Sequence, residues 1–135
     1  MLARRLVHGV GFQTHLGGTY AIFGAAVPGG IQPNLQRFIE LGLRVAITEM
    51  DVQANGLGDT PSERRAAQRD VYERVLGACV AVAGCDSMTF WGFTDRHTWI
   101  RDFLAIADDP LPWDEKYLPK AAFFGVRDAL ITAHP

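Results

Sequence analysis

Three short apolar segments alternate along the chain with stretches of helical periodicity, and this alternation restricts the possible folds more than any other feature. The apolar segments are residues 7–12, 43–51 and 87–91, and each has the composition of a buried strand. Strands that alternate with helices usually lie parallel, joined by right-handed crossovers with the helices outside the sheet. The sequence therefore predicts an α/β fold with three parallel strands in the order β-α-β-α-β-α.

The helices are expected where apolar residues recur at spacings of three and four: over residues 32–43, from Pro61 to a stop at Gly84, and over residues 120–131. Of the three predicted helix starts, the one at Pro61 has the clearest signal, because Thr60 can cap the helix and Glu63 can close a capping box. The expected apolar faces comprise Leu35, Phe38, Ile39 and Leu43; Val71, Val75, Cys79 and Val82; and Ala122, Phe124, Val126 and Leu130.

Polar side chains gather where the first two predicted strands end, which is where α/β proteins usually carry functional residues. Side chains alternate along a strand, so Gln13 and His15 are expected to share one face, as are Glu49 and Asp51. If these strands are neighbours, an imidazole lies within reach of two carboxylates and can orient one as a nucleophile. The alternative is a polar strand end in which Asp51 only caps a turn.

Two tryptophans follow the third predicted strand near the same edge of the sheet. Trp91 ends the strand and Trp99 lies in the loop beyond it. Indole rings offer flat apolar surfaces on which the C–H faces of sugar rings can stack. Core packing is the more common role for a tryptophan placed as Trp91 is, whereas the loop position of Trp99 favours a ligand contact.

Length and charge limit the classes of function. The 135 residues suffice for one domain, residues 1–135, and the formal net charge of −2 without long basic runs argues against nucleic acid or anionic membranes as partners. No apolar stretch has the length of a membrane-spanning helix, and the first residues lack the apolar segment of a signal peptide.

The two cysteines, Cys79 and Cys85, have no neighbouring Cys or His pair that would complete a zinc site, so no metal is expected. A short disulfide and a pair of free thiols both fit their spacing.

Four segments together resemble glycoside hydrolase family 10, the xylan-degrading barrel enzymes. GVGFQTHL at residues 9–16, VAITEMDV at 45–52 and WGFTDRHTW at 91–99 are similar to the motifs of that family's sixth, seventh and eighth strands, in the same order. LPWDEKYLPK at 111–120 is similar to the entry to its last helix. The resemblance implies that residues 1–135 are the C-terminal portion, strands six to eight, of a TIM (β/α)₈ barrel, and thus part of a catalytic domain.

The resemblance also implies roles for individual residues. Glu49 matches the family's nucleophile, with His15 and Asp51 as its hydrogen-bonded support. Gln13 is expected near the point of cleavage. The other positions that the resemblance assigns are Trp91 as the floor of a sugar subsite, Trp99 as its cover, and Cys79 and Cys85 as a short disulfide. The implied activity is endo-1,4-beta-xylanase, a retaining O-glycosyl hydrolase without a cofactor that acts on xylan or xylo-oligosaccharides outside the cell.

One catalytic group of the family has no counterpart in the sequence. The family's acid/base Glu follows an Asn, and no Asn-Glu dipeptide occurs here. A complete barrel needs about 250 residues, so the chain is expected to supply only the nucleophile half and to be weak or inactive alone. Two other hypotheses remain: a non-catalytic carbohydrate binder, and a scaffold that associates with itself or with a missing N-terminal part of the barrel.

Overall fold

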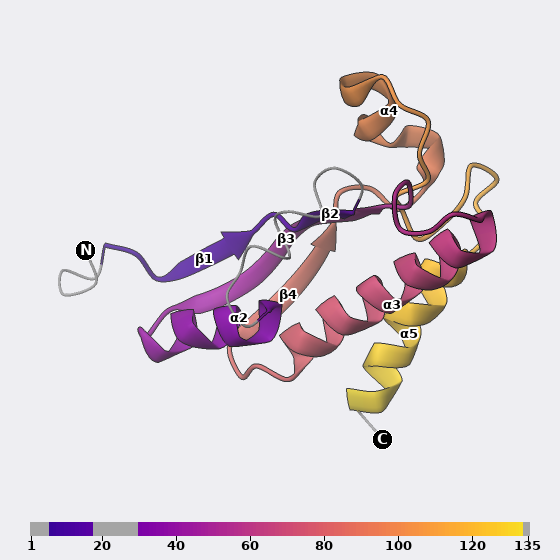
Figure 1. Cartoon of the computed structure of the whole chain (residues 1–135). Helices are drawn as coiled ribbons and strands as arrows, with labels where there is room; N and C mark the ends of the chain where they lie inside the picture. The colour runs from indigo at the N-terminus through magenta and orange to yellow at the C-terminus, as the bar shows by residue number, and fades with distance from the viewer. Residues whose placement is uncertain (1–5, 18–29, 134–135) are drawn as a thin grey trace.

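The computed structural model describes residues 6–17 and 30–133 and contains four strands with the helices that connect and cover them (Figure 1). The elements are β1 (Gly9–Phe12), β2 (His15–Gly17), α2 (Ile31–Glu40), β3 (Arg44–Gln53), α3 (Pro61–Val80), β4 (Cys85–Phe90), the short 3₁₀ helix η3 (Asp95–His97), α4 (Trp99–Leu104) and α5 (Ala121–Ala133).

The sheet is parallel, with the long strand β3 at its centre. β1 pairs with the first half of β3 and β2 with its last residues, while β4 pairs with β3 on the other side (Figure 1). The predicted parallel α/β architecture is confirmed. Strand bounds differ by a few residues from those expected, and Trp91 directly follows β4 rather than ending it.

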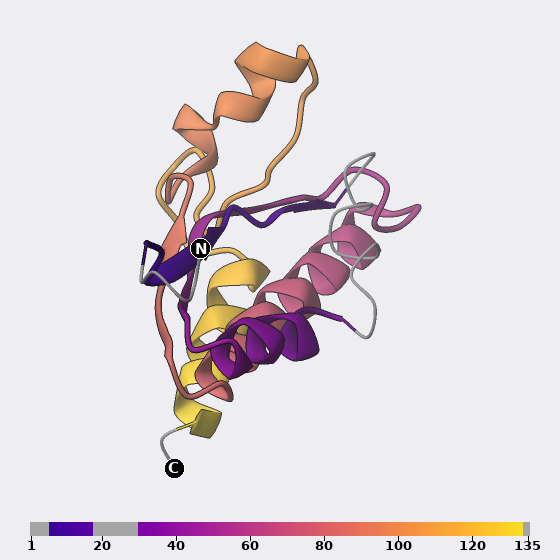
Figure 2. The ribbon, with the colours of Figure 1, turned by 90° about the vertical axis from the view of Figure 1, so that its left-hand side faces the viewer.

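Helices α2, α3 and α5 pack on one face of this sheet, whereas α4 lies apart, beyond the strand ends (Figure 2). The core between the sheet and these helices is apolar and includes Leu35, Val45, Ile47, Met50, Val52, Tyr72, Val75, Cys79 and Val82. Among the described residues, no helix is long and apolar enough to cross a membrane.

β3 is irregular, and the irregularity decides which of its side chains face the helices. Simple alternation would place Val45 and Ile47 on the same face as Glu49 and Asp51. The pairing of β3 with β4 shifts register between Ile47 and Met50. As a result Val45 and Ile47 are buried in the core, at 2% and 0% exposure, while Glu49 and Asp51 still lie together.

The first predicted strand is broken, contrary to the expectation that Gln13 and His15 belong to one strand. Thr14 has a φ of 64°, a conformation that interrupts a strand, and its hydroxyl donates to the Phe12 carbonyl at 3.1 Å. The chain resumes as β2, in which His15 pairs with Asp51 of β3. The His15 position therefore comes from the β2–β3 register and not from alternation along a continuous strand.

Helix α3 begins as the sequence predicts. The Thr60 side chain accepts from the Glu63 backbone N–H, and the Glu63 side chain accepts from the Thr60 backbone N–H. Its last turn is joined to the start of β4 by a disulfide between Cys79 and Cys85, with the two Cα atoms 5.4 Å apart.

The apolar face expected for the last helix is partly wrong. Ala122, Gly125 and Ala129 are buried against α3, whereas Phe124 and Leu130 are 38% and 44% exposed. The cause is close packing: a Cβ added at Gly125 would lie 2.4 Å from the Arg69 carbonyl oxygen. Small residues therefore form the contact, and the large apolar residues lie outside it.

Candidate active site

His15, at the start of β2, lies between two carboxylates of β3. Its Nε2 is 3.4 Å from Glu49 Oε2, and its Nδ1 is 3.0 Å from Asp51 Oδ1. His15 and Glu49 side chains are each about a quarter exposed, whereas Asp51 is 1% exposed. The structure therefore brings together the three side chains that the sequence singled out, with Glu49 the more accessible carboxylate.

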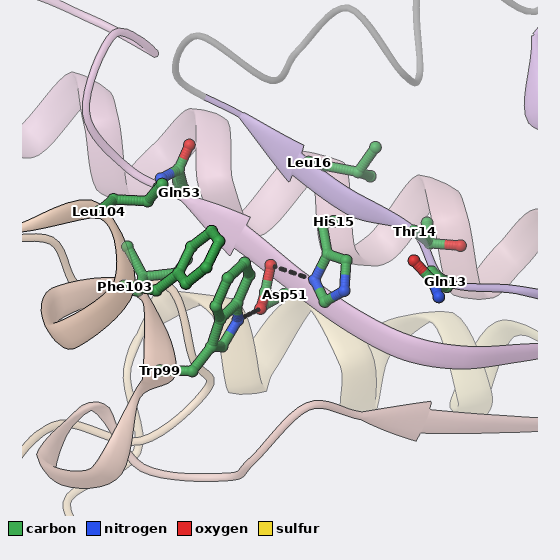
Figure 3. Close-up of a pocket in the computed structure, with 10 residues that line it drawn as sticks. Gln13, Thr14, His15, Leu16, Asp51, Gln53, Trp99, Phe103 and Leu104 are labelled. Carbon is green, nitrogen blue, oxygen red and sulfur yellow. Dashed lines mark hydrogen bonds and ion pairs between the residues drawn. The ribbon is translucent and has the colours of Figure 1, made fainter.

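Asp51 is held from a second direction by Trp99. The indole Nε1 of Trp99 donates to Asp51 Oδ2 at 2.6 Å (Figure 3). Burial raises the pKa of Asp51 above its ordinary value, while the hydrogen bond from Trp99 and the nearby His15 oppose that rise. Asp51 thus acts as a buried anchor that fixes His15 and Trp99 relative to each other.

Both tryptophans approach the His15 ring edge-on. The ring centroids of His15 and Trp99 are 5.2 Å apart, and those of His15 and Trp91 are 6.3 Å apart. Trp91 is 46% exposed, so it is not a core residue. Trp99 is the first residue of α4 and does not lie in a loop as expected, because the Thr98 hydroxyl caps a short helix there.

A cavity of about 380 Å³ opens beside His15, between the ends of β2 and β3 and helix α4 (Figure 3). It is lined by Gln13, Thr14, His15, Leu16, Asp51, Gln53, Trp99, Ile100, Phe103 and Leu104. Gln13 therefore shares this cavity with His15. Glu49 and Trp91 are not among its lining residues.

Sequence reasoning missed Gln53 and Phe103 of this lining. Gln53 follows Asp51 by two positions and could have been found by extending β3. Phe103 follows Trp99 by four positions, the spacing that places two residues on one helix face. The short helix had no apolar periodicity long enough to reveal it.

A buried ion pair fixes the loop that follows β4. Lys120 Nζ lies 2.7 Å from Asp95 Oδ2 and also donates to the carbonyls of Asp109 and Leu111. The Leu111 backbone N–H donates to the other Asp95 oxygen at 2.8 Å. Burial raises the pKa of Asp95 to about 6, against the opposing effect of Lys120. The network ties α4 and its flanking loops to the start of α5.

This arrangement favours chemistry at a carboxylate. An accessible Glu49 beside an imidazole that is anchored by a buried Asp is suited to nucleophilic attack or to charge stabilisation. Within residues 6–17 and 30–133, no three His, Cys, Asp or Glu side chains are placed to hold a metal ion.

Comparison with known proteins gives one consistent answer. The profile of Glycosyl hydrolase family 10 matches residues 1–129. An endo-1,4-beta-xylanase of Agaricus bisporus is 38% identical over 122 residues, which cover 90% of this chain and 34% of that protein.

Solved structures agree. A glycosylated endo-beta-1,4-xylanase of Gloeophyllum trabeum superposes with a TM-score of 0.80 at 32% identity, covering 96% of this chain and 38% of the other. Xylanase 10B of Thermotoga petrophila, in complex with xylobiose, gives 0.77 at 29% identity, covering 92% and 36%.

The chain spans about a third of the length of these relatives. Its fold is accordingly a portion of the (β/α)₈ barrel, with parallel strands and the helices that cover them. The strand-end motifs, the geometry around His15 and the comparisons together show that this chain belongs to glycosyl hydrolase family 10.

Proposed function

We propose that this chain carries the nucleophile half of a retaining endo-1,4-beta-xylanase, with Glu49 as the nucleophile and His15 and Asp51 as its positioning residues. The observation that carries the proposal is the contact series in which His15 Nε2 lies 3.4 Å from Glu49 and Nδ1 lies 3.0 Å from the buried Asp51. Membership in glycosyl hydrolase family 10 supports xylan as the substrate class.

The proposed chemistry starts with attack of the Glu49 carboxylate on the anomeric carbon of a xylose unit. The bond from that carbon to the leaving oxygen breaks, the leaving group takes the electron pair, and an ester to Glu49 forms. Water then cleaves the ester and restores the carboxylate. His15, fixed by Asp51, keeps Glu49 oriented, and the exposed Trp91 and the Asp51-bound Trp99 offer surfaces for the sugar ring.

Protonation of the leaving oxygen requires a second carboxyl group about 5 Å from the nucleophile. Glu40, Glu63 and Glu73 lie on helices and Glu115 lies in the loop before α5, so none is positioned for this role. We therefore propose that the chain alone hydrolyses xylan weakly or not at all. The disulfide is typical of oxidising compartments and supports an extracellular location for the parent protein.

An aryl β-xyloside with a good leaving group tests the proposal because its departure needs little protonation. We expect the chain to release about one equivalent of phenol and then to slow, while Glu49→Gln releases none. Glu40→Gln, a substitution at an exposed position on α2, should behave as the unmodified chain does. Release that persists in Glu49→Gln would refute Glu49 as the nucleophile, and xylan turnover like that of a full-length xylanase would refute the half-site proposal.

A second candidate is a carbohydrate-binding fragment without chemistry, which the large exposed face of Trp91 favours. Retention of xylan affinity by Glu49→Gln, together with no phenol release by the unmodified chain, would support this alternative.

A further inference from the structure

The ion pair between Asp95 and Lys120 lies outside the cavity beside His15, and neither residue takes part in the proposed reaction. The two side chains are 3% and 11% exposed. Removing two charges from water is costly, and hydrophobic residues of similar volume often stabilise a protein at least as well as a buried ion pair does. The contacts that the pair makes are therefore more informative about its role than its contribution to stability.

One set of contacts runs from Asp95 to Trp99. The Asp95 backbone carbonyl accepts from the Thr98 backbone N–H at 3.4 Å, and the Thr98 hydroxyl caps α4, whose first residue is Trp99. The indole of Trp99 donates to Asp51, which in turn meets His15 (Figure 3). A displacement of Asp95 would therefore reach the anchor of His15 through a single short segment.

A second set of contacts runs through the backbone of residues 109–111. The lysine ammonium of the pair donates to the carbonyls of the first and last of these residues at 2.6 and 2.8 Å, and the aspartate carboxylate accepts from the N–H of the last at 2.8 Å. The residue between them, Pro110, accepts from the Val52 backbone N–H at 3.1 Å. Val52 directly follows Asp51 in β3. Both sets of contacts therefore end at Asp51 and its neighbour, one through a side chain and one through the backbone.

We propose that Asp95 and Lys120 are positioning residues of the candidate active site, which act through Trp99 and residues 109–111 to hold Asp51 in place. The links form a continuous series of covalent and hydrogen bonds, and such networks carry energetic coupling between separate parts of a protein. The role rests on the proposed function for the reaction that it serves, whereas the coupling itself concerns only the geometry around Asp51.

The charge of Asp95 should control how firmly the pair holds these contacts. Burial raises the pKa of Asp95 to about 6, against the opposing effect of Lys120. Tyr72 of α3 also faces the Asp95 charge. The other charged side chains around Asp95 line a neighbouring cavity with it: Arg65, Arg101, Asp109, Asp114, Glu115 and Lys116. Below about pH 6 the ion pair loses its negative partner, so Trp99 should be held less firmly.

The indole N–H signal of Trp99 in NMR spectra tests the coupling without any reaction. The chain has three tryptophans, and Trp99→Phe identifies the signal by removing it. We expect the signal to move with pH around a midpoint of about 6 in the unmodified chain. Asp95→Asn, whose side chain cannot ionise, should lose this step, and Lys120→Met should move the signal toward its low-pH position. His15 and Asp51 are present in all three chains, so the difference isolates the ion pair.

The rate at which a 2-fluoro xyloside labels Glu49 tests whether the coupling serves the reaction. Asp95→Asn should slow labelling about tenfold at pH 8, because a small misplacement caused by a distant mutation can cost up to about 100-fold. At pH 5 the two chains should react at similar rates, since Asp95 is then protonated in the unmodified chain as well. A purely structural role would lower the labelled fraction of the chain and leave the rate of the folded fraction unchanged.

Lys116→Met is the matched control, because it removes an exposed lysine from the same loop. It should leave both the Trp99 signal and the labelling rate unchanged. A Trp99 signal without a step near pH 6 in the unmodified chain would overturn the inference, as would the same step in Asp95→Asn or equal labelling rates at pH 8. An unmodified chain that is not labelled at all would refute the proposed function instead, and the Trp99 signal would then decide the coupling alone.

Discussion

At the scale of single residues, the buried carboxylate of Asp51 organises the site. Its Oδ1 lies 3.0 Å from His15 Nδ1, and its Oδ2 accepts a hydrogen bond of 2.6 Å from the Trp99 indole N–H. Each contact stabilises the charged form of Asp51 against the cost of burial. Losing either contact should therefore disturb His15 as well as Asp51.

Trp99→Phe removes one hydrogen bond and keeps an aromatic ring. Because the lost bond stabilised the carboxylate, the pKa of Asp51 should rise further above its ordinary value. Carbon-detected NMR titration of the Asp51 carboxyl measures this directly. Trp91→Phe is the control, since Trp91 contacts the His15 ring but makes no hydrogen bond to Asp51. An unchanged pKa in Trp99→Phe would show that this bond contributes little.

Lys120→Met tests the buried ion pair with Asp95. Removing one partner of such a pair typically costs about 3–5 kcal/mol, and denaturation at pH 8 should show a loss of this size. Asp95 has a raised pKa of about 6 in the folded protein, so its contribution to stability is present at low pH and lost as the pH rises through that value.

The cost of Lys120→Met should therefore shrink at pH 5, where Asp95 is largely protonated and needs no cation. Lys116→Met, which changes an exposed lysine in the same loop, should alter stability little at either pH. Lys120→Met could instead lower the unfolding free energy by the same amount at pH 5 and pH 8. That result would argue against an uncompensated Asp95 charge as the cause of the loss.

The residues of the site were predictable to different degrees. Glu49, His15 and Asp51 could be singled out because each lies at or near the end of a strand predicted from the sequence, with a chemically suggestive neighbour. The sequence predicted that these side chains meet, but on the basis of alternation along one continuous strand. Thr14 breaks that strand, and it is the β2–β3 register that places His15 opposite Asp51. Gln53 and Phe103 carry no sequence signal beyond their spacing from Asp51 and Trp99.

At the scale of elements, helix bounds and strand order follow from local sequence signals. Which face of a helix or strand is buried depends instead on how the elements pack. The capping box at Thr60 specified the start of α3 because it is a local hydrogen-bond pattern. The register shift in β3 has no such local signature. Because of it, Val45 and Ile47 lie in the core, although simple alternation would place them on the face of Glu49 and Asp51. Close helix contact likewise made Gly125, and not Phe124, a buried residue of α5.

Gly125→Ala tests that helix contact. The added Cβ would lie 2.4 Å from the Arg69 carbonyl oxygen of α3, so the helices must separate, at a cost of about 1–3 kcal/mol in unfolding free energy. Gly77→Ala is a matched control in α3, because a Cβ there meets nothing within 4 Å.

The control should be neutral or stabilising by up to about 1 kcal/mol, since alanine favours a helix over glycine. Chemical denaturation compares the two variants. Equal effects of Gly125→Ala and Gly77→Ala would show that α3 and α5 do not pack as closely as described.

At the scale of the whole molecule, the sheet has one covered face, one open face and two outer edges. Large apolar residues of the strands lie on the covered face: Val45 and Ile47 are buried under the helices, and Phe12 and Phe90 pack against the same core. Residues left toward the other side include Gly11, Thr48, Ser87 and Thr89. This arrangement reduces the apolar area that the open face exposes to solvent, and with it the free-energy cost of that exposure.

The strand edges remain open in the described structure: β4 and the β1–β2 side have no further partner strand. Unpaired edges promote association, so we predict that the purified chain forms oligomers or pairs with a chain that supplies the remaining barrel strands. Light scattering across a concentration series measures this. A cooperative, well-folded monomer at all concentrations would contradict the prediction.

The central claim, that Glu49 is the nucleophile of a xylan-type glycosidase site, is tested most directly by covalent labelling. A 2-fluoro xyloside with a good leaving group should form a stable ester with the attacking carboxylate, and peptide mass spectrometry locates it. We expect one sugar per chain on the peptide containing Glu49, with labelling reduced in His15→Ala and absent in Glu49→Gln. Labelling at another carboxylate, or none under conditions that label a full-length family member, would contradict the claim.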